Sequence, residues 1–146
     1  NVGHRAIWEV GVAVWLLTVW DLALDPAMAH ESLRVKFWVW HQTGFYFGMP
    51  LQNLLGWIAT GLAFMAVSRL LWQGDVRPGQ APVLIPFAVY AANVVWAMVL
   101  SASVGLWGPI LLATVLGIAP AVVALRDRLA IPGSGAPVPG ASGASA

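Results

Sequence analysis

Residues 6–24 read AIWEVGVAVWLLTVWDLAL, a stretch long and apolar enough to cross a bilayer, for which a helix needs about 20 residues. Its only charged residues are Glu9 near the start and Asp21 near the end. Three further apolar stretches follow at about residues 50–71, 83–101 and 106–125. The sequence therefore predicts an all-α integral membrane protein, a bundle of about four transmembrane helices.

The composition of the whole chain supports this prediction. Hydrophobic residues make up 60% of the 146 residues and charged residues 9%, and the mean hydropathy is +0.79, whereas soluble domains carry roughly 25% charged residues. Disorder needs the opposite composition. Seven basic and six acidic residues give a net charge of +1, which excludes the charge pattern of a nucleic-acid-binding protein. With no cysteine, disulfides, thiolate catalysis and thiolate metal sites are excluded.

Two segments do not read as spans. The stretch after the first span mixes charged residues with aromatic ones, as is typical of a segment lying at the membrane interface. Its residues of both kinds are Glu31, Arg34, Lys36, Phe37, Trp38 and Trp40. Residues 131–146 contain mainly Gly, Ala, Pro and Ser and no charge, and we expect them to form a flexible tail. Residues 1–130 would then form a single membrane domain.

The basic residues predict an orientation. Four spans place most of them on the same side as both termini: Arg5, Arg69, Arg77, Arg126 and Arg128. Arg34 and Lys36 lie on the other side. Because positive charge is retained inside, we expect both termini to be cytoplasmic, in a bacterial or archaeal cytoplasmic membrane. The chain begins with Asn1 and shows no signal-peptide pattern, so we expect a processed chain or a piece of a longer protein.

Ionisable residues inside a membrane are candidates for function. Asp21 and Asp25 are spaced i, i+4, so if the helix reaches that far their carboxyls lie on one face about 6 Å apart. Two such carboxylates do not both ionise readily in a low dielectric, and one is expected to hold its proton and serve as a general acid. An alternative for Asp25 is that it caps a new helix whose first residue is Pro26; the two roles can coexist.

Two other polar residues lie within spans. Glu9 is about 18 Å along the helix axis from Asp21, near the opposite membrane face, and is either a separate site or a helix-packing residue. Asn93 lies at mid-depth of the third span, where an amide usually bonds to a neighbouring helix.

His30, Glu31 and His41 could in principle contribute to a metal site near the interface. Their spacing matches no metal-binding motif. We therefore expect no metal.

Residues 44–57 read GFYFGMPLQNLLGW, which places glycines, aromatics and two amides at the start of the second span. Glycine allows close backbone approach, and Pro50 favours a helix start. Gln52 and Asn53 would lie in the first turn, where they can orient water or a carboxyl. The alternative, which spacing alone favours, is an aromatic belt followed by small residues for helix contact. Those small residues are Gly56, Thr60 and Gly61.

The run Asp21-Leu22-Ala23-Leu24-Asp25-Pro26, with residues 44–57 downstream, resembles the CruF-like integral-membrane carotenoid 1,2-hydratase family, of the bisanhydrobacterioruberin hydratase type. Motifs carry the resemblance from about Glu9 to Leu71, and hydropathy alone extends it to Leu125. Members of that family are usually longer, with additional spans upstream, so this chain resembles their C-terminal half. His41-Gln42 departs from the more apolar or acidic residues expected there.

The resemblance implies addition of water across the C1,C2 double bond of an acyclic carotenoid end group. Protonation of C2 leaves a tertiary cation at C1, so the reaction needs a protonated carboxyl, a held water and aromatic faces beside the cation. Asp21 or Asp25 would be the acid and the other the base, with Asn53 orienting water. The residues expected on the substrate are Glu9, Trp38, Tyr46 and Trp57. No cofactor is required, because hydration is redox neutral, and the partners would be a carotenoid or other polyisoprenoid and membrane lipids.

Two other classes remain open. The chain could be a non-catalytic multi-span subunit or accessory protein of a larger membrane complex, one that holds pigments, with other membrane subunits as partners. A transporter half would use the same acids as a proton relay, but the sequence lacks a pair of interrupted helices in matching halves.

Overall fold

The chain is described by a computed structural model that covers residues 2–71 and 84–130. The predicted tail, residues 131–146, lies outside this part. The elements are α1 (Val2–Met28), α2 (Leu51–Leu71), α3 (Leu84–Ser103), α4 (Trp107–Leu112), a π-helix η1 (Ala113–Ile118) and α5 (Ala119–Ala130). Within residues 2–71 and 84–130, four stretches are long and apolar enough to span a membrane: Ala6–Met28, Leu51–Leu71, Leu84–Ser103 and Trp107–Arg126. The predicted four-span helical membrane protein is confirmed.

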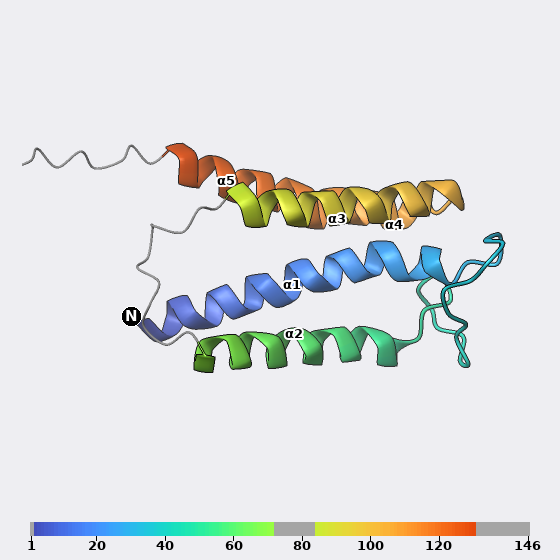
Figure 1. Cartoon of the computed structure of the whole chain (residues 1–146), viewed down its shortest axis with the longest axis horizontal. Coiled ribbons are helices and arrows are strands. Elements are labelled where there is room, and N and C mark those ends of the chain that lie inside the picture. Colours follow the sequence, from blue (N-terminus) through green and yellow to red (C-terminus); the bar gives the residue numbers. More distant parts are fainter. Residues whose placement is uncertain (1, 72–83, 131–146) are drawn as a thin grey trace, which may run out of the picture.

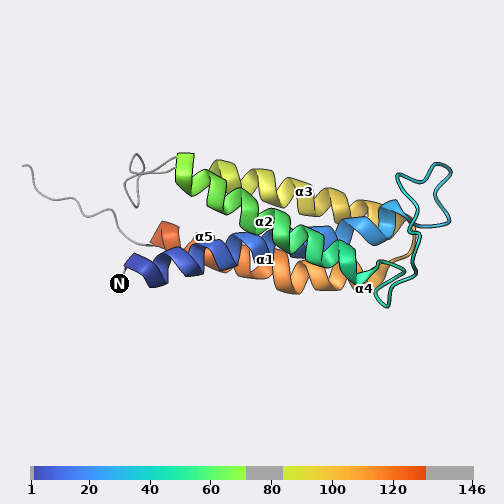
Figure 2. The ribbon, with the colours of Figure 1, turned by 90° about the horizontal axis from the view of Figure 1, so that it is seen from below.

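Helix α1 is the central element of the bundle. It packs against α2 on one side and against α3, α4 and η1 on the other (Figure 1). Helix α2 contacts only α1 among the described helices. The four spans run along one long axis, and the segment between α1 and α2 lies at one end of the bundle (Figure 2).

The packed core lies between α1 and the last two spans. It is built mainly from small residues, which allow helix backbones to approach closely in a membrane. Its buried members are Ala23, Leu24, Val94, Ala97 and Ala113. Ser101 adds a hydrogen bond from its hydroxyl to the Ala23 carbonyl at 2.6 Å, so α1 and α3 are joined by both packing and a buried polar contact.

Helix α1 extends beyond the predicted end of its span, through Pro26 to Met28. The interpretation that Asp25 and Pro26 begin a new helix is therefore wrong. Proline has no N–H, so Pro26 leaves the carbonyl of Leu22, one turn earlier, without its usual donor. The Tyr46 hydroxyl donates to that carbonyl at 3.0 Å. A donor from outside the helix thus replaces the missing bond, as a membrane environment requires.

In the last span, too, a side chain donates to a carbonyl that a proline leaves without its usual donor. Pro120 cannot donate to the carbonyl of Leu116, and the backbone before it widens into the π-helix η1, a common form of local irregularity. The indole N–H of Trp15 on α1 donates to the Leu116 carbonyl at 3.0 Å. A side chain of α1 therefore bonds the irregular turn of the neighbouring span.

Asn93 does not join two helices among the residues that the structure describes. Its side chain is exposed and donates to the Val89 carbonyl of its own helix at 2.8 Å. The predicted interhelical role is wrong, because an amide can satisfy itself on the preceding turn of the same helix.

Candidate functional site

The two acids of α1 form a buried pair. Because α1 continues past Asp25, both carboxyls lie on one helix face, and they are 0% exposed at Asp21 and 2% at Asp25. Asn53, in the first turn of α2, donates from Nδ2 to Asp25 Oδ2 at 2.6 Å and to Asp21 Oδ2 at 3.4 Å. One amide therefore bridges both acids, as the prediction that Asn53 orients a carboxyl requires.

The bridge leaves half of each carboxyl unused. Oδ1 of Asp21 and Oδ1 of Asp25 are buried and have no hydrogen-bond partner among the residues that the structure describes. Among the described residues the only salt bridge joins Glu9 to Arg69, so no basic side chain compensates the pair. Since a buried polar oxygen without a partner is costly, the two Oδ1 atoms are positions for a proton, a water or a polar atom of a ligand.

A tight turn after the interfacial segment completes this end of the bundle. Gly44 N–H donates to the Gly48 carbonyl at 3.0 Å, and Met49 N–H donates to the Tyr46 carbonyl at 2.8 Å. A Cβ on Gly44 would lie 1.8 Å from the Met49 carbonyl oxygen, which no side chain permits. Phe47 and Gly48 have φ of 47° and 85°, in the left-handed region. The turn therefore depends on glycine at position 44.

The turn contacts three helices. Tyr46 bonds to α1, and Phe47 packs over Gly108 of α4, where a Cβ would meet the ring at 2.7 Å. Met49 is buried, and its Sδ lies 3.3 Å from Asn53 Nδ2. Burial, and after it the nearby Asp21 carboxylate, raises the pKa of Tyr46 to about 12, so its hydroxyl keeps the proton that it donates to α1.

Two hollows lie beside residues of the acid cluster, although neither is lined by Asp21 or Asp25. An open one of about 310 Å³ lies on α2 and is lined by Gln52, Asn53, Gly56, Trp57 and Thr60. A smaller one of about 180 Å³ lies between the turn, α1, the start of α2 and α4, and is lined by Leu22, Phe45, Tyr46, Met49, Pro50, Leu51, Leu54 and Leu112. Asn53 borders the first and Met49 the second. We refer to the smaller hollow as the apolar groove.

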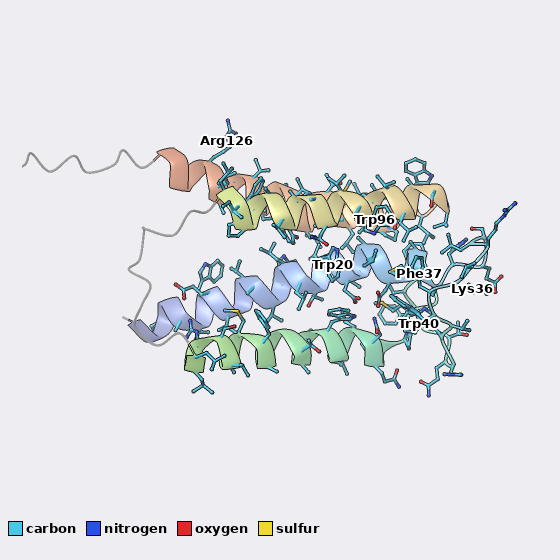
Figure 3. The ribbon with its side chains drawn as sticks, in the orientation of Figure 1. Trp20, Lys36, Phe37, Trp40, Trp96 and Arg126 are labelled. Atoms are coloured by element: carbon cyan, nitrogen blue, oxygen red, sulfur yellow. The ribbon has the colours of Figure 1, made fainter. Side chains whose placement is uncertain are left out.

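The predicted aromatic residues divide between two places. Trp57 lies beside Asp21 and edge-on to Trp20, with ring centroids 5.7 Å apart; Figure 3 shows Trp20 as a side chain of α1. Trp38 instead pairs edge-on with Trp40 at 6.0 Å in the segment at the end of the bundle, where Figure 3 also shows Phe37 and Lys36. Trp57 and Tyr46 therefore adjoin the acids, whereas the contact of Trp38 is with its neighbour in the segment.

Glu9 lies at the other end of the α1–α2 pair. Arg69 Nη2 is 3.1 Å from Glu9 Oε2 and also donates to the Ala6 carbonyl at 2.9 Å. The structure does not bring Glu9 to the acid pair. Of the two interpretations of Glu9, the helix-packing one has the observed partner.

Three smaller expectations have mixed outcomes. Gly61 is the small residue that contacts α1, since a Cβ there would lie 3.2 Å from Val14 and Leu17 side chains, whereas Gly56 has open space and lines the larger hollow. The Nδ1 atom of His30 is bonded to the Ser32 hydroxyl at 2.6 Å. Gln52 donates to Gln42 at 3.1 Å, which ties the start of α2 to the interfacial segment.

Sequence reasoning did not single out Met49. A lone methionine before Pro50 carries no signal for a contact with an amide, and Gln42 stood out only as a departure from the expected residue type.

This arrangement can be compared with known proteins. The sequence model of the carotenoid biosynthesis protein family matches residues 1–120, which include the acid pair, the turn, Asn53 and both hollows. The chain belongs to this family, and as a protein with four spans it has a role in carotenoid biosynthesis at a membrane. No curated protein and no solved structure matches the chain significantly.

Proposed function

We propose that the chain hydrates an acyclic carotenoid, adding water across the C1,C2 double bond of an end group. The observation that carries this proposal is the pair of buried carboxyls, bridged by one amide and each left with one oxygen that has no partner in the described part of the chain. Acid-catalysed hydration of an alkene needs one group that gives a proton and one that receives it. Two adjacent carboxyls of which one is protonated supply both.

The two carboxyls can supply and receive every proton that this reaction needs. The protonated carboxyl gives its proton to C2, and the π electrons of the double bond form the new C2–H bond, which leaves a tertiary cation at C1. The oxygen of a water bonds to C1 and loses one proton to the second carboxylate. The product gains one water in total. Asp21 and Asp25 are direct neighbours, so a proton can return from one to the other before the next turnover.

Three side chains support the same reaction. Asn53 holds Oδ2 of both acids and so aims their Oδ1 atoms elsewhere. The aromatic faces of Trp57 and Tyr46 adjoin the acids and can stabilise a developing cation by cation–π attraction. Desolvation around the pair strengthens every electrostatic interaction within it. Neither an organic cofactor nor a redox metal enters the balance.

A non-catalytic role is the second candidate, and the exposure of α2 favours it. This helix contacts only α1 among the described helices, and large apolar side chains are exposed around much of it: Leu51, Leu55, Leu62, Phe64, Val67, Leu70 and Leu71. Such a face suits either lipid or another membrane subunit. In this role the acids would hold helices together and would not react.

The test is the mass of pigments extracted from a host that makes acyclic carotenoids and expresses the complete gene. We expect the wild type to add the mass of one water, and Asp21→Asn and Asp25→Asn each to lower product formation by about 100-fold or more. Glu9→Gln is the matched control, since it neutralises an acid of the same helix outside the pair, and should stay close to wild type. Unchanged pigment mass with folded wild-type protein, or full product with both aspartate variants, would favour the subunit role.

A further inference from the structure

The apolar groove offers a ligand only hydrocarbon and aromatic surface. All of its lining residues are apolar except Tyr46, and the Tyr46 hydroxyl is already bonded to the Leu22 carbonyl. A lipid headgroup, an ion or a sugar would find no polar partner on these walls. A hydrocarbon chain end would lose nothing by leaving the bilayer for this surface.

The groove lies where two spans fail to meet. Leu51 and Leu54 come from α2 and Leu112 from α4, yet α2 and α4 make no helix–helix contact. Only the turn joins them, through Phe47 on Gly108. Because lipid surrounds the spans, a hydrocarbon can reach the groove sideways from the bilayer without crossing a polar surface.

Met49 connects the groove with the amide that bridges the two acids. Its side chain lines the groove and is 2% exposed, and its Sδ contacts the Asn53 amide that bridges both carboxyls. Methionine is unbranched, with three rotatable bonds, so a change of rotamer moves this wall without moving the backbone. Neither acid lines the groove in this structure, so a ligand in the groove would reach the pair by displacing the Met49 side chain.

We propose that the apolar groove binds the terminal isoprenoid unit of an acyclic carotenoid, and that Met49 is the movable wall that admits this unit to Asp21 and Asp25. The identity of the reaction at the acids rests on the function proposed above, whereas binding in the groove does not. The chemistry of the walls and their contact with the acid bridge select a hydrocarbon end group as the occupant.

The binding arm of the test uses photolabelling with a farnesyl ether that carries a terminal diazirine, on the full-length protein in membranes, with labelled peptides identified by mass spectrometry. We expect labels on groove residues and competition by an acyclic carotenoid. Leu112→Trp and Leu54→Trp fill the groove from two walls and should lower groove labelling about tenfold, a loss worth 1.4 kcal/mol. Their lipid-facing neighbours provide matched controls, Leu111→Trp and Leu55→Trp, which are 66% and 55% exposed in the wild type.

A kinetic experiment tests whether Met49 must move to admit the substrate. Met49→Leu keeps volume and much of the flexibility, whereas Met49→Ile introduces a β-branched, stiff side chain. We expect Met49→Ile to lower kcat several-fold with little change in KM, and Met49→Leu to stay near the wild type. Equal effects of the two variants would overturn the role of Met49.

The outcomes separate the two proposals. Labelling in the groove without any hydration would support the proposed binding site and contradict the proposed hydratase function. Hydration that persists in Leu112→Trp and Leu54→Trp, with labels spread evenly over lipid-facing residues, would overturn the groove and leave the hydratase function standing.

Discussion

The two ends of the α1–α2 pair are joined by polar contacts of opposite character. At one end Glu9 and Arg69 form an ion pair whose side chains are 65% and 42% exposed. At the other, two acids share one amide at 0% and 2% exposure. The exposed pair is complete in itself, whereas the buried cluster has two oxygens unsatisfied and no basic partner among the described residues. The two ends therefore differ in whether the polar groups of the contact satisfy one another.

The largest expected effect concerns which side of the membrane each end faces. The chain has no cysteine, so single cysteines can be introduced directly. We expect Val35→Cys, in the segment next to the acid cluster, to react with an impermeant maleimide in intact cells, and Leu71→Cys, at the ion-pair end, to react only after lysis. The basis is the excess of arginine at the ion-pair end. The reverse pattern would place the acid cluster on the cytoplasmic side.

Removal of the turn should abolish the cluster while sparing the ion pair. In Gly44→Ala the new Cβ overlaps the Met49 carbonyl, so the turn cannot close and Asn53 loses its position. We expect product formation to fall to background and local protection from hydrogen exchange to drop over residues 44–53. Gly56→Ala is the control, because a Cβ there meets nothing within 4 Å. Normal activity in Gly44→Ala would show that the turn does not position the site.

Removing the polar partner at each end of the α1–α2 pair should lower the free energy of unfolding by unequal amounts. Asn53→Ala removes the amide donor from two buried carboxyls and should lower the free energy of unfolding in detergent by about 1–3 kcal/mol. Arg69→Ala removes one member of an exposed pair, for which about 0–1 kcal/mol is expected. Thermal and denaturant unfolding of the two variants side by side would measure both. Equal losses would contradict the contrast between the two ends.

A small effect, comparable with that of Arg69→Ala, is expected from loss of the hydroxyl that bonds to the carbonyl freed by Pro26. Tyr46→Phe keeps the ring and removes the bond to the Leu22 carbonyl, which should cost about 0.5–1.5 kcal/mol, as for other hydrogen bonds between membrane helices. Calorimetry in the same detergent would measure it. Trp15→Phe, which removes the donor to Leu116, should fall in the same range although it lies far from the acids.

The sequence predicts the four spans well, because hydrophobic length dominates helix formation in a membrane. It fails at the end of α1. Pro26 reads as a break, and nothing near it in the sequence shows that Tyr46 replaces the lost bond. The same reason hides the π-helix, whose freed carbonyl is bonded by Trp15 from another span. A proline inside a membrane helix thus predicts that the carbonyl one turn earlier needs another hydrogen-bond donor. Which side chain donates depends on the tertiary structure and cannot be read from the sequence.

The candidate site was predicted in part for similar reasons. Helical spacing places Asp21 and Asp25 on one face, and the first-turn position of Asn53 suits a carboxyl contact. The partner of Glu9 was not foreseen, because Arg69 is one of several basic residues and only packing selects it. Met49 was missed, since a methionine carries no sequence signal for a wall between a groove and an amide.

The central position of α1 has a consequence for how this protein can change over generations. One face of α1 holds the acids, another packs on α3, and its carbonyls receive donors from the turn, so most substitutions on it disturb two functions at once. The outer face of α2 meets none of these constraints. Inherited variation should therefore accumulate on the outer face of α2, away from Asn53 and Trp57, and be removed from α1. The protein can then adapt its fit to lipid or to a partner subunit without altering the helix that carries the acids.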